Sequence, residues 1–167
     1  MNIPHPITKI IPVNCAIITV SDTRTVETDK SGELMKNLLI QAGYNVIFYQ
    51  IIKDEITQIE SLLIELGNNQ DLDCLIFSGG TGISPRDTTY DVISKLLTKT
   101  LSGFGEIFRM LSYQEIGSRA ITSRAVAGIY QQKIVFSLPG SVNAVKLGLE
   151  KLIIPELPHL IEQIKSN

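Results

Sequence analysis

The chain has 167 residues, of which 44% are apolar and 19% charged, and its formal net charge is −2. This composition is typical of a globular protein, and the length predicts one domain whose core needs no disulfide or metal for stability. A nearly neutral chain without a Lys/Arg cluster argues against a nucleic-acid partner, because phosphate binding needs basic side chains. No apolar stretch approaches the roughly 18 residues that would span a membrane, so we expect no membrane segment.

The two cysteines indicate the compartment. Cys15 and Cys74 each lie within a short apolar run of the kind that forms a buried strand. Buried thiols explain them better than a disulfide does, and sparse cysteine suits a reducing environment. Because the N-terminus also lacks a signal-peptide pattern, the sequence predicts a cytoplasmic protein.

Apolar patterning divides the chain into alternating elements. Residues 1–12 contain three prolines and are predicted to form an extended N-terminal arm before a single domain over residues 13–167. Apolar, largely β-branched runs predict strands over residues 14–20, 44–52, 74–77 and 133–137. Helical spacing of apolar residues predicts helices around residues 34–42, 59–66, 145–153 and 157–164. This alternation predicts an α/β fold of three layers, a mostly parallel sheet with helices on both faces and a more irregular, partly helical middle.

A glycine-rich segment follows the third predicted strand, with the sequence Ser78-Gly79-Gly80-Thr81-Gly82-Ile83-Ser84-Pro85-Arg86-Asp87. In open α/β sheets, ligands bind beyond the carboxyl ends of strands. Glycines there let the backbone approach a ligand and turn its N–H groups toward an anion. The spacing matches no Walker A loop. The alternative is a tight turn into a helix that Thr88 or Thr89 caps.

Two aspartates are candidate metal ligands. Asp87 follows the glycines, where a carboxylate suits a magnesium ion that bridges phosphate oxygens. Asp54 follows the second predicted strand, and carboxylates from separate loops can converge on one ion. The alternative for Asp54 is that it caps the following helix.

Other polar segments have structural alternatives of their own. Ser21-Asp22 with Asp29 follows the first strand, and Pro139-Gly140-Ser141 precedes a helix whose N-terminus can bind phosphate or simply use Ser141 as a cap. Glu106 and Arg109 have the spacing of a surface ion pair on a helix. The two histidines, His5 and His159, lie near the ends of the chain, which argues against a Ser-His-Asp or Cys-His site. No Cys/His cluster has zinc-ligand spacing.

Five motifs occur in a characteristic order from about Asn14 onward. They are Thr19-Val20-Ser21-Asp22 with Asp29-Lys30-Ser31-Gly32, the glycine segment ending in Arg86-Asp87, Gly103-Phe104-Gly105-Glu106-Ile107-Phe108-Arg109-Met110-Leu111-Ser112, Ser123-Arg124-Ala125-Val126-Ala127-Gly128, and Leu138-Pro139-Gly140-Ser141. In these motifs the sequence resembles the MoaB/MogA family of molybdenum cofactor proteins, and it is closer to the MoaB branch.

The resemblance implies an activity and a set of site residues. Family members transfer adenylyl from Mg-ATP to the terminal phosphate of molybdopterin and release pyrophosphate. Asp54 and Asp87 match the acidic catalytic pair that holds Mg²⁺. The positions that match the molybdopterin and nucleotide pocket are Ser21, Asp22, Asp29, Ser78, Gly79, Gly80, Thr81, Gly82, Glu106, Arg109, Ser112, Ser123, Arg124, Pro139, Gly140 and Ser141.

The resemblance also implies a homo-oligomer, either a trimer or a dimer of trimers, and the molybdate-insertion enzyme as a partner. Phe104, Phe108 and Tyr113 suit an interface, although core packing explains them equally well. The alternative functions are a non-catalytic molybdopterin carrier, a nucleotide-cofactor pyrophosphatase or deamidase, and another phosphate-binding metabolic enzyme.

Overall fold

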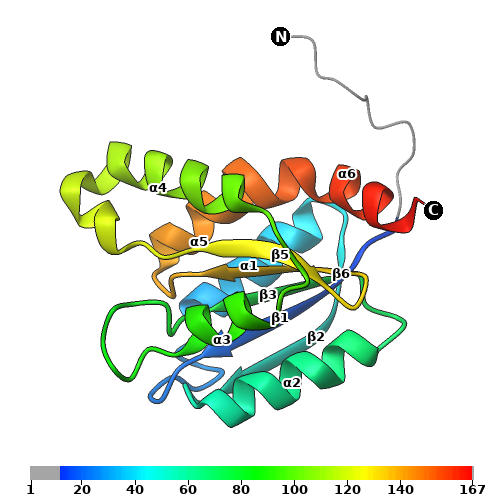
Figure 1. The fold of residues 1–167 in the computed structure, drawn as a ribbon, viewed down its shortest axis with the longest axis horizontal. Coiled ribbons are helices and arrows are strands. Elements are labelled where there is room, and N and C mark those ends of the chain that lie inside the picture. Colours follow the sequence, from blue (N-terminus) through cyan, green and yellow to red (C-terminus); the bar gives the residue numbers. More distant parts are fainter. Residues whose placement is uncertain (1–11, 167) are drawn as a thin grey trace, which may run out of the picture.

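The structure is a computed structural model that describes residues 12–166, and it has three layers built around one six-stranded sheet (Figure 1). The predicted N-terminal arm lies outside the described residues, except for Pro12. The strand order is β2-β1-β3-β6-β5-β4. The strands are β1 (Asn14–Val20), β2 (Asn45–Ile52), β3 (Cys74–Ser78), β4 (Lys99–Thr100), β5 (Val126–Tyr130) and β6 (Lys133–Leu138).

The sheet is mostly parallel, which confirms the predicted fold class. Strands β2, β1, β3 and β6 pair in parallel, whereas β5 runs antiparallel to both β6 and β4. A two-residue turn joins β5 to β6, and both of its residues, Gln131 and Gln132, have positive φ (45° and 61°). Two positive-φ residues give a turn whose twist matches that of a hairpin. No strand was predicted at β5. A hairpin turn of this kind normally contains Gly or Asn, and the Gln131-Gln132 turn contains neither.

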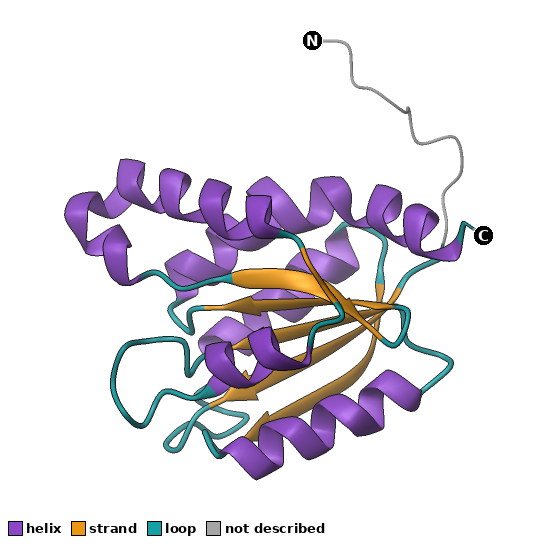
Figure 2. Ribbon diagram, in the orientation of Figure 1, coloured by secondary structure: helices purple, strands orange, loops and turns teal. Residues whose placement is uncertain are grey.

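Helices cover both faces of the sheet (Figure 2). Helices α1, α4, α5 and α6 pack on one face, and α2 and α3 pack on the other. Segments α5, η2 and α6 follow one another along the chain without a break. The helical segments are α1 (Lys30–Gln41), α2 (Ile56–Asn68), α3 (Thr89–Leu96), α4 (Ser102–Ile116), the 3₁₀ segment η1 (Gly117–Thr122), α5 (Val142–Gly148), the π segment η2 (Leu149–Ile153) and α6 (Ile154–Lys165).

Strand β1 shows why the central strands read as continuous apolar runs. Cys15 and Ile17 contribute to the core under α1, α5 and α6, while Ala16 and Ile18 contribute to the core over α2 and α3. A strand with a helix layer on each side buries both of its faces. Cys15 lies opposite Cys74 of β3, and both are buried free thiols, as predicted. Burial raises the pKa of the Cys74 thiol.

Helix α4 occupies the middle of the chain, where an irregular, partly helical segment is predicted. Phe108 is fully buried, and the ring of Phe104 lies 6.4 Å from that of Phe108 and 5.2 Å from that of Phe136. These two phenylalanines therefore belong to the core, whereas Tyr113 is 64% exposed. Within residues 12–166, no helix is long and apolar enough to cross a membrane.

Candidate functional site

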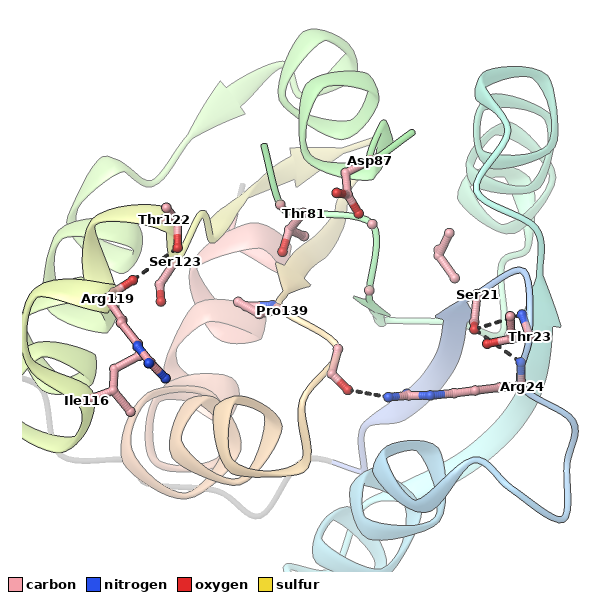
Figure 3. A pocket seen from close by; sticks show the side chains of 15 residues that line it. Ser21, Thr23, Arg24, Thr81, Asp87, Ile116, Arg119, Thr122, Ser123 and Pro139 are labelled. Carbon is pink, nitrogen blue, oxygen red and sulfur yellow. Dashed lines mark hydrogen bonds between the residues drawn. The ribbon is translucent and has the colours of Figure 1, made fainter. Parts of the chain in front are cut away.

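The site lies where the carboxyl ends of the parallel strands meet. The segments after β1, β3 and β6 and the segment before β5 surround a cavity of about 480 Å³. Figure 3 shows Ser21, Thr23 and Arg24 on one side and Arg119 with Ser123 on the other. The expected site residues that line this cavity are Ser21, Gly79, Gly80, Thr81, Gly82, Asp87, Ser123, Pro139 and Gly140.

The glycine segment has a backbone that other residues would not adopt. Gly79 and Gly80 have φ values of 105° and 64°. A Cβ atom on Gly79 would lie 2.2 Å from the Val20 carbonyl oxygen. A Cβ atom on Gly80 would lie 2.2 Å from a carboxylate oxygen of Asp54 and from the hydroxyl of Thr89. Glycine is therefore required at both positions by conformation and by space.

The carbonyl groups of this loop are held by protein donors. The Gly80 carbonyl accepts a hydrogen bond from the Thr89 N–H at 2.9 Å, and the Thr81 and Gly82 carbonyls accept from Arg124 at 2.8 and 2.6 Å. In residues 12–166, no acceptor pairs with the N–H groups of Gly80 through Ile83. Gly80, Thr81 and Gly82 line the cavity, so their N–H groups are available to an anionic ligand.

Asp54 does not cap α2. Its Oδ1 atom accepts hydrogen bonds from the N–H and the hydroxyl of Thr88, at 3.0 and 2.6 Å. The N-cap of α2 is Glu55, and the N-cap of α3 is Thr88, neither with a side-chain capping bond. The cap prediction for Asp54 is therefore wrong, whereas Thr88 is the N-cap residue of α3 as the alternative expected. The Thr88 hydroxyl makes no capping bond because it donates to Asp54. Asp54 is 5% exposed.

The two aspartates flank the same short segment. Asp54 lies beside Gly80, and a Cβ atom on Gly82 would lie 2.8 Å from a carboxylate oxygen of Asp87. Asp87 is half-buried and lines the cavity. Over residues 12–166, no three His, Cys, Asp or Glu side chains are grouped to hold a metal ion. A cation at these two carboxylates would therefore complete its oxygen ligands from a bound phosphate and water.

Asp22 links two of the loops and does not line the cavity. Its carboxylate accepts from Nε and Nη2 of Arg86 at 2.8 and 2.9 Å, and its Oδ1 accepts from the Asp54 N–H at 3.3 Å. The hydrogen bonds from Arg86 lower the pKa of Asp22. Such a two-bond pair fixes the relative position of the segments after β1 and β3.

Asp29 is a buried anchor for Arg24. It caps α1 by accepting from the Gly32 N–H at 3.0 Å, and it also accepts from Tyr49 at 2.7 Å and from Arg24 at 3.2 Å. Burial opposes ionisation of this carboxyl, but the hydrogen bonds outweigh it and hold its pKa below the ordinary value. Arg24 also donates to the Gly140 carbonyl at 2.9 Å, so Asp29 orients a cation that lines the cavity.

Several cavity residues were not predicted from the sequence. Arg24 follows β1 by four positions, and Arg119 comes from η1, which no periodic pattern marked. These two side chains bring positive charge to the cavity from opposite sides. The remaining residues that were missed are Val20, Thr23, Ile116 and Thr122.

Several expected site residues do not line the cavity. Ser78 is fully buried within β3, and Ser141 caps α5 by accepting from the Ala144 N–H at 3.2 Å. Arg124 contacts the glycine loop rather than the cavity. Glu106, Arg109 and Ser112 lie on α4, which packs against the sheet. Asp22, Asp29 and Asp54 are not among the lining residues either. The expected pair of Glu106 with Arg109 is not formed in the described part of the chain.

The fold and cavity define a three-layer α/β protein that offers backbone N–H groups and two arginines to an anionic ligand, with the Asp87 carboxylate at the cavity and Asp54 buried beside Gly80. The profile of the family described as "Probable molybdopterin binding domain" matches residues 16–159. Molybdenum cofactor biosynthesis protein B of Halalkalibacterium halodurans is 52% identical over 156 residues, which cover 93% of this chain and 92% of that protein. The chain belongs to the family of molybdenum cofactor biosynthesis proteins, and this relative is of the B type.

Solved structures agree with this assignment. A crystal structure of molybdenum cofactor biosynthesis protein B matches with a TM-score of 0.90 and 48% identity, covering 92% of this chain and 96% of that one. The tungsten cofactor synthesizing protein MoaB from Pyrococcus furiosus matches with a TM-score of 0.83 and 38% identity, covering 95% and 100%. The resemblance inferred from the motifs is confirmed.

Proposed function

We propose that this chain is a molybdopterin adenylyltransferase that uses ATP and Mg²⁺. The observation that carries the proposal is the convergence of Asp54 and Asp87 on the Gly80–Gly82 segment, whose N–H groups have no acceptor within residues 12–166. Phosphoryl chemistry needs charge neutralisation and alignment more than it needs a proton acceptor. Family membership supplies molybdopterin as the second substrate.

The proposed reaction transfers one nucleotidyl group. An oxygen of the terminal phosphate of molybdopterin attacks the α-phosphorus of ATP, and the bond from that phosphorus to the bridging oxygen breaks. Pyrophosphate leaves with the bonding electrons, and adenylylated molybdopterin remains. A phosphate monoester is already an anion at neutral pH, so the attack needs no histidine base. Arg24, Arg119 and the loop N–H groups are suited to bind the negative charge of the two substrates.

The residues present fit a magnesium ion. Mg²⁺ in nucleotide sites is held by one or two carboxylates together with phosphate oxygens and water. Asp87 borders the cavity, and the Asp54 oxygen beside Gly80 is not the one that Thr88 binds. When bound, the ion would neutralise charge that develops on the phosphates.

The second candidate is a molybdopterin carrier without turnover. It is favoured by one observation: Asp54 is 5% exposed and anchors Thr88, a task that needs no metal. Purified protein with molybdopterin, ATP and Mg²⁺ distinguishes the two candidates. Pyrophosphate release that depends on both substrates supports the transferase, whereas molybdopterin binding without pyrophosphate release supports the carrier.

We also propose that the chain forms a closed homo-oligomer, a trimer or a dimer of trimers, through the outer face of α4. Ile107, Met110 and Tyr113 on this face are 44%, 54% and 64% exposed, while Phe108 on the inner face is buried. A helix that is apolar on both faces is normally covered on both. Another copy of the chain packed against this face would cover its exposed apolar side chains, and most homo-oligomers have closed symmetry.

A further inference from the structure

Arg124, at the entry to β5, contacts two other parts of the fold, the glycine loop and α3. Its Nε donates to the Thr81 carbonyl at 2.8 Å, and its Nη2 donates to the Gly82 carbonyl at 2.6 Å. Nη1 and Nη2 also donate to the two carboxylate oxygens of Asp91, at 2.8 and 3.0 Å. The guanidinium carbon lies 4.6 Å from the centre of the Tyr90 ring. One side chain thus joins the entry to β5, the first turn of α3 and the glycine loop.

These contacts leave Arg124 little capacity for a ligand. A guanidinium has five N–H groups, and the four hydrogen bonds to protein acceptors occupy four of them. A two-bond fork to a phosphate is therefore unavailable without breaking the existing bonds. Arg124 is also not among the residues that line the cavity.

The same contacts determine which backbone groups of the loop remain available. Arg124 binds the Thr81 and Gly82 carbonyls, and the Thr89 N–H binds the Gly80 carbonyl. Three consecutive carbonyl groups are thereby held by the protein, while the N–H groups of the loop are left to the cavity. Release of the Gly82 carbonyl would also disturb Asp87, because that carboxylate packs against Gly82.

We propose that Arg124 is a positioning residue that orients the glycine loop, so that its N–H groups and the carboxylate of Asp87 are set before a ligand binds. Asp91 and Tyr90 hold the guanidinium in place from α3. The expected effect on catalysis rests on the proposed transferase function, whereas the effect on loop order does not. Preorganised donors of this kind need no rearrangement when charge develops on the substrate.

Only arginine provides this geometry. Its planar fork reaches two carbonyl groups and a carboxylate together, whereas a lysine ammonium is a single point donor. The ion pair with Asp91 contributes little stability by itself, because the Asp91 side chain is 62% exposed and such pairs are screened by water. The main effect of the ion pair is to orient the Arg124 guanidinium.

The first test measures loop order without any ligand. NMR order parameters of the N–H groups of Gly80, Thr81 and Gly82 are compared between the unmutated protein and Arg124→Gln. We expect values below about 0.6, the range of flexible backbone, in the variant and rigid values in the parent. Lys95→Gln is the control, because it removes one exposed positive charge from α3, the helix that contacts Arg124, without touching the loop. Rigid values in folded Arg124→Gln overturn the proposal.

The second test separates positioning from stability. Arg124→Gln and Asp91→Asn both break the ion pair, but only the first removes the bonds to the loop carbonyls. We expect Arg124→Gln to raise the KM for ATP or lower kcat by about a hundredfold, as a displacement of reacting groups of about 1 Å does. Arg124→Lys should recover part of the loss, and Asp91→Asn should lose much less. Equal losses in Arg124→Gln and Asp91→Asn that follow their melting temperatures overturn the proposal.

The two tests also distinguish this proposal from the proposed function. If the unmutated protein releases no pyrophosphate while Arg124→Gln still loosens the loop, the transferase assignment fails and the positioning role stands. Binding of ATP with Mg²⁺ by calorimetry then replaces turnover as the measurement. Unchanged affinity in Arg124→Gln would count against the positioning role.

Discussion

The Oδ1 atom of Asp54 accepts two hydrogen bonds from Thr88, one from the N–H at 3.0 Å and one from the hydroxyl at 2.6 Å. These bonds join the end of β2 to the start of α3 across 34 positions of sequence. They also hold the carboxylate beside Gly80. Asp54 therefore holds Thr88 through hydrogen bonds and also carries a negative charge. Different substitutions can remove the charge or a hydrogen bond separately.

Asp54→Asn should remove activity and keep the fold. The amide retains an oxygen that accepts from Thr88, but it loses the charge that would bind Mg²⁺. We expect adenylyl transfer to fall about 10²–10³-fold with a nearly unchanged melting temperature. Thr88→Val is the complementary variant, because it keeps the charge and removes the hydroxyl bond, and it should lower the free energy of unfolding by about 1–3 kcal/mol. Full activity in Asp54→Asn would show that the carboxylate only anchors Thr88.

Asp87→Asn should also reduce activity and keep the fold, because Asp87 is proposed to bind the same Mg²⁺ ion as Asp54. We expect transfer to fall about 10²–10³-fold while molybdopterin affinity, measured by calorimetry, changes little. The double variant Asp54→Asn/Asp87→Asn should lose less than the product of the single losses, because both carboxylates act on one cation. Glu65→Gln, an exposed carboxylate on α2, is the control for loss of charge. Strictly multiplicative losses would contradict a shared ion.

Gly82→Ala and Gly80→Ala should have different consequences. A Cβ atom on Gly82 would meet only the movable carboxylate of Asp87, at 2.8 Å. Gly82→Ala should therefore reduce turnover strongly and leave the melting temperature nearly intact. Gly80 combines a φ of 64° with contacts at 2.2 Å to Asp54 and Thr89, so Gly80→Ala should lower both stability and ligand binding. Thermal melts and calorimetry on both variants check this difference, and equal destabilisation would contradict it.

Asp29 should make stability depend on pH in the acid range. Its pKa is lowered in the folded state, so its contribution is present above the pKa of the unfolded chain and is lost as pH falls through the folded value. We expect Asp29→Asn to be less stable than the parent near pH 7, by roughly 2–3 kcal/mol for a charged hydrogen-bond acceptor. The difference should shrink as the pH is lowered below about 4, which urea titrations at several pH values would measure. A constant difference across that range would exclude ionisation as its source.

Ile107→Glu should disrupt the proposed oligomer. Ile107 on the outer face of α4 is 44% exposed, and a charge there would be costly to bury in an interface. Ile64→Glu on α2 is a closely matched control, since Ile64 is 45% exposed on the opposite side of the sheet. Light scattering should report a smaller assembly for Ile107→Glu only. A monomeric parent protein at micromolar concentration would rule out the oligomer itself.

Local sequence determined the fold class and the place of the site. Apolar runs were enough to identify β1, β3 and β6, because strands between two helix layers are buried on both faces. The edge strand β2 was identified by its β-branched and aromatic residues. Glycines directly after β3 and acidic residues after β2 and β3 were enough to locate the candidate site, since the carboxyl ends of parallel strands share one edge.

Only the tertiary structure decided what the individual polar side chains contact. Arg24 binds the Gly140 carbonyl across 116 positions, and Arg124 reaches the Gly82 carbonyl across 42. Sequence periodicity reports which face of an element is buried, but it does not report which distant acceptor a long side chain reaches. For the same reason Asp54 looked like a helix cap. A cap and a cross-loop anchor place the same residue after a strand, and only the position of Thr88 in space separates them.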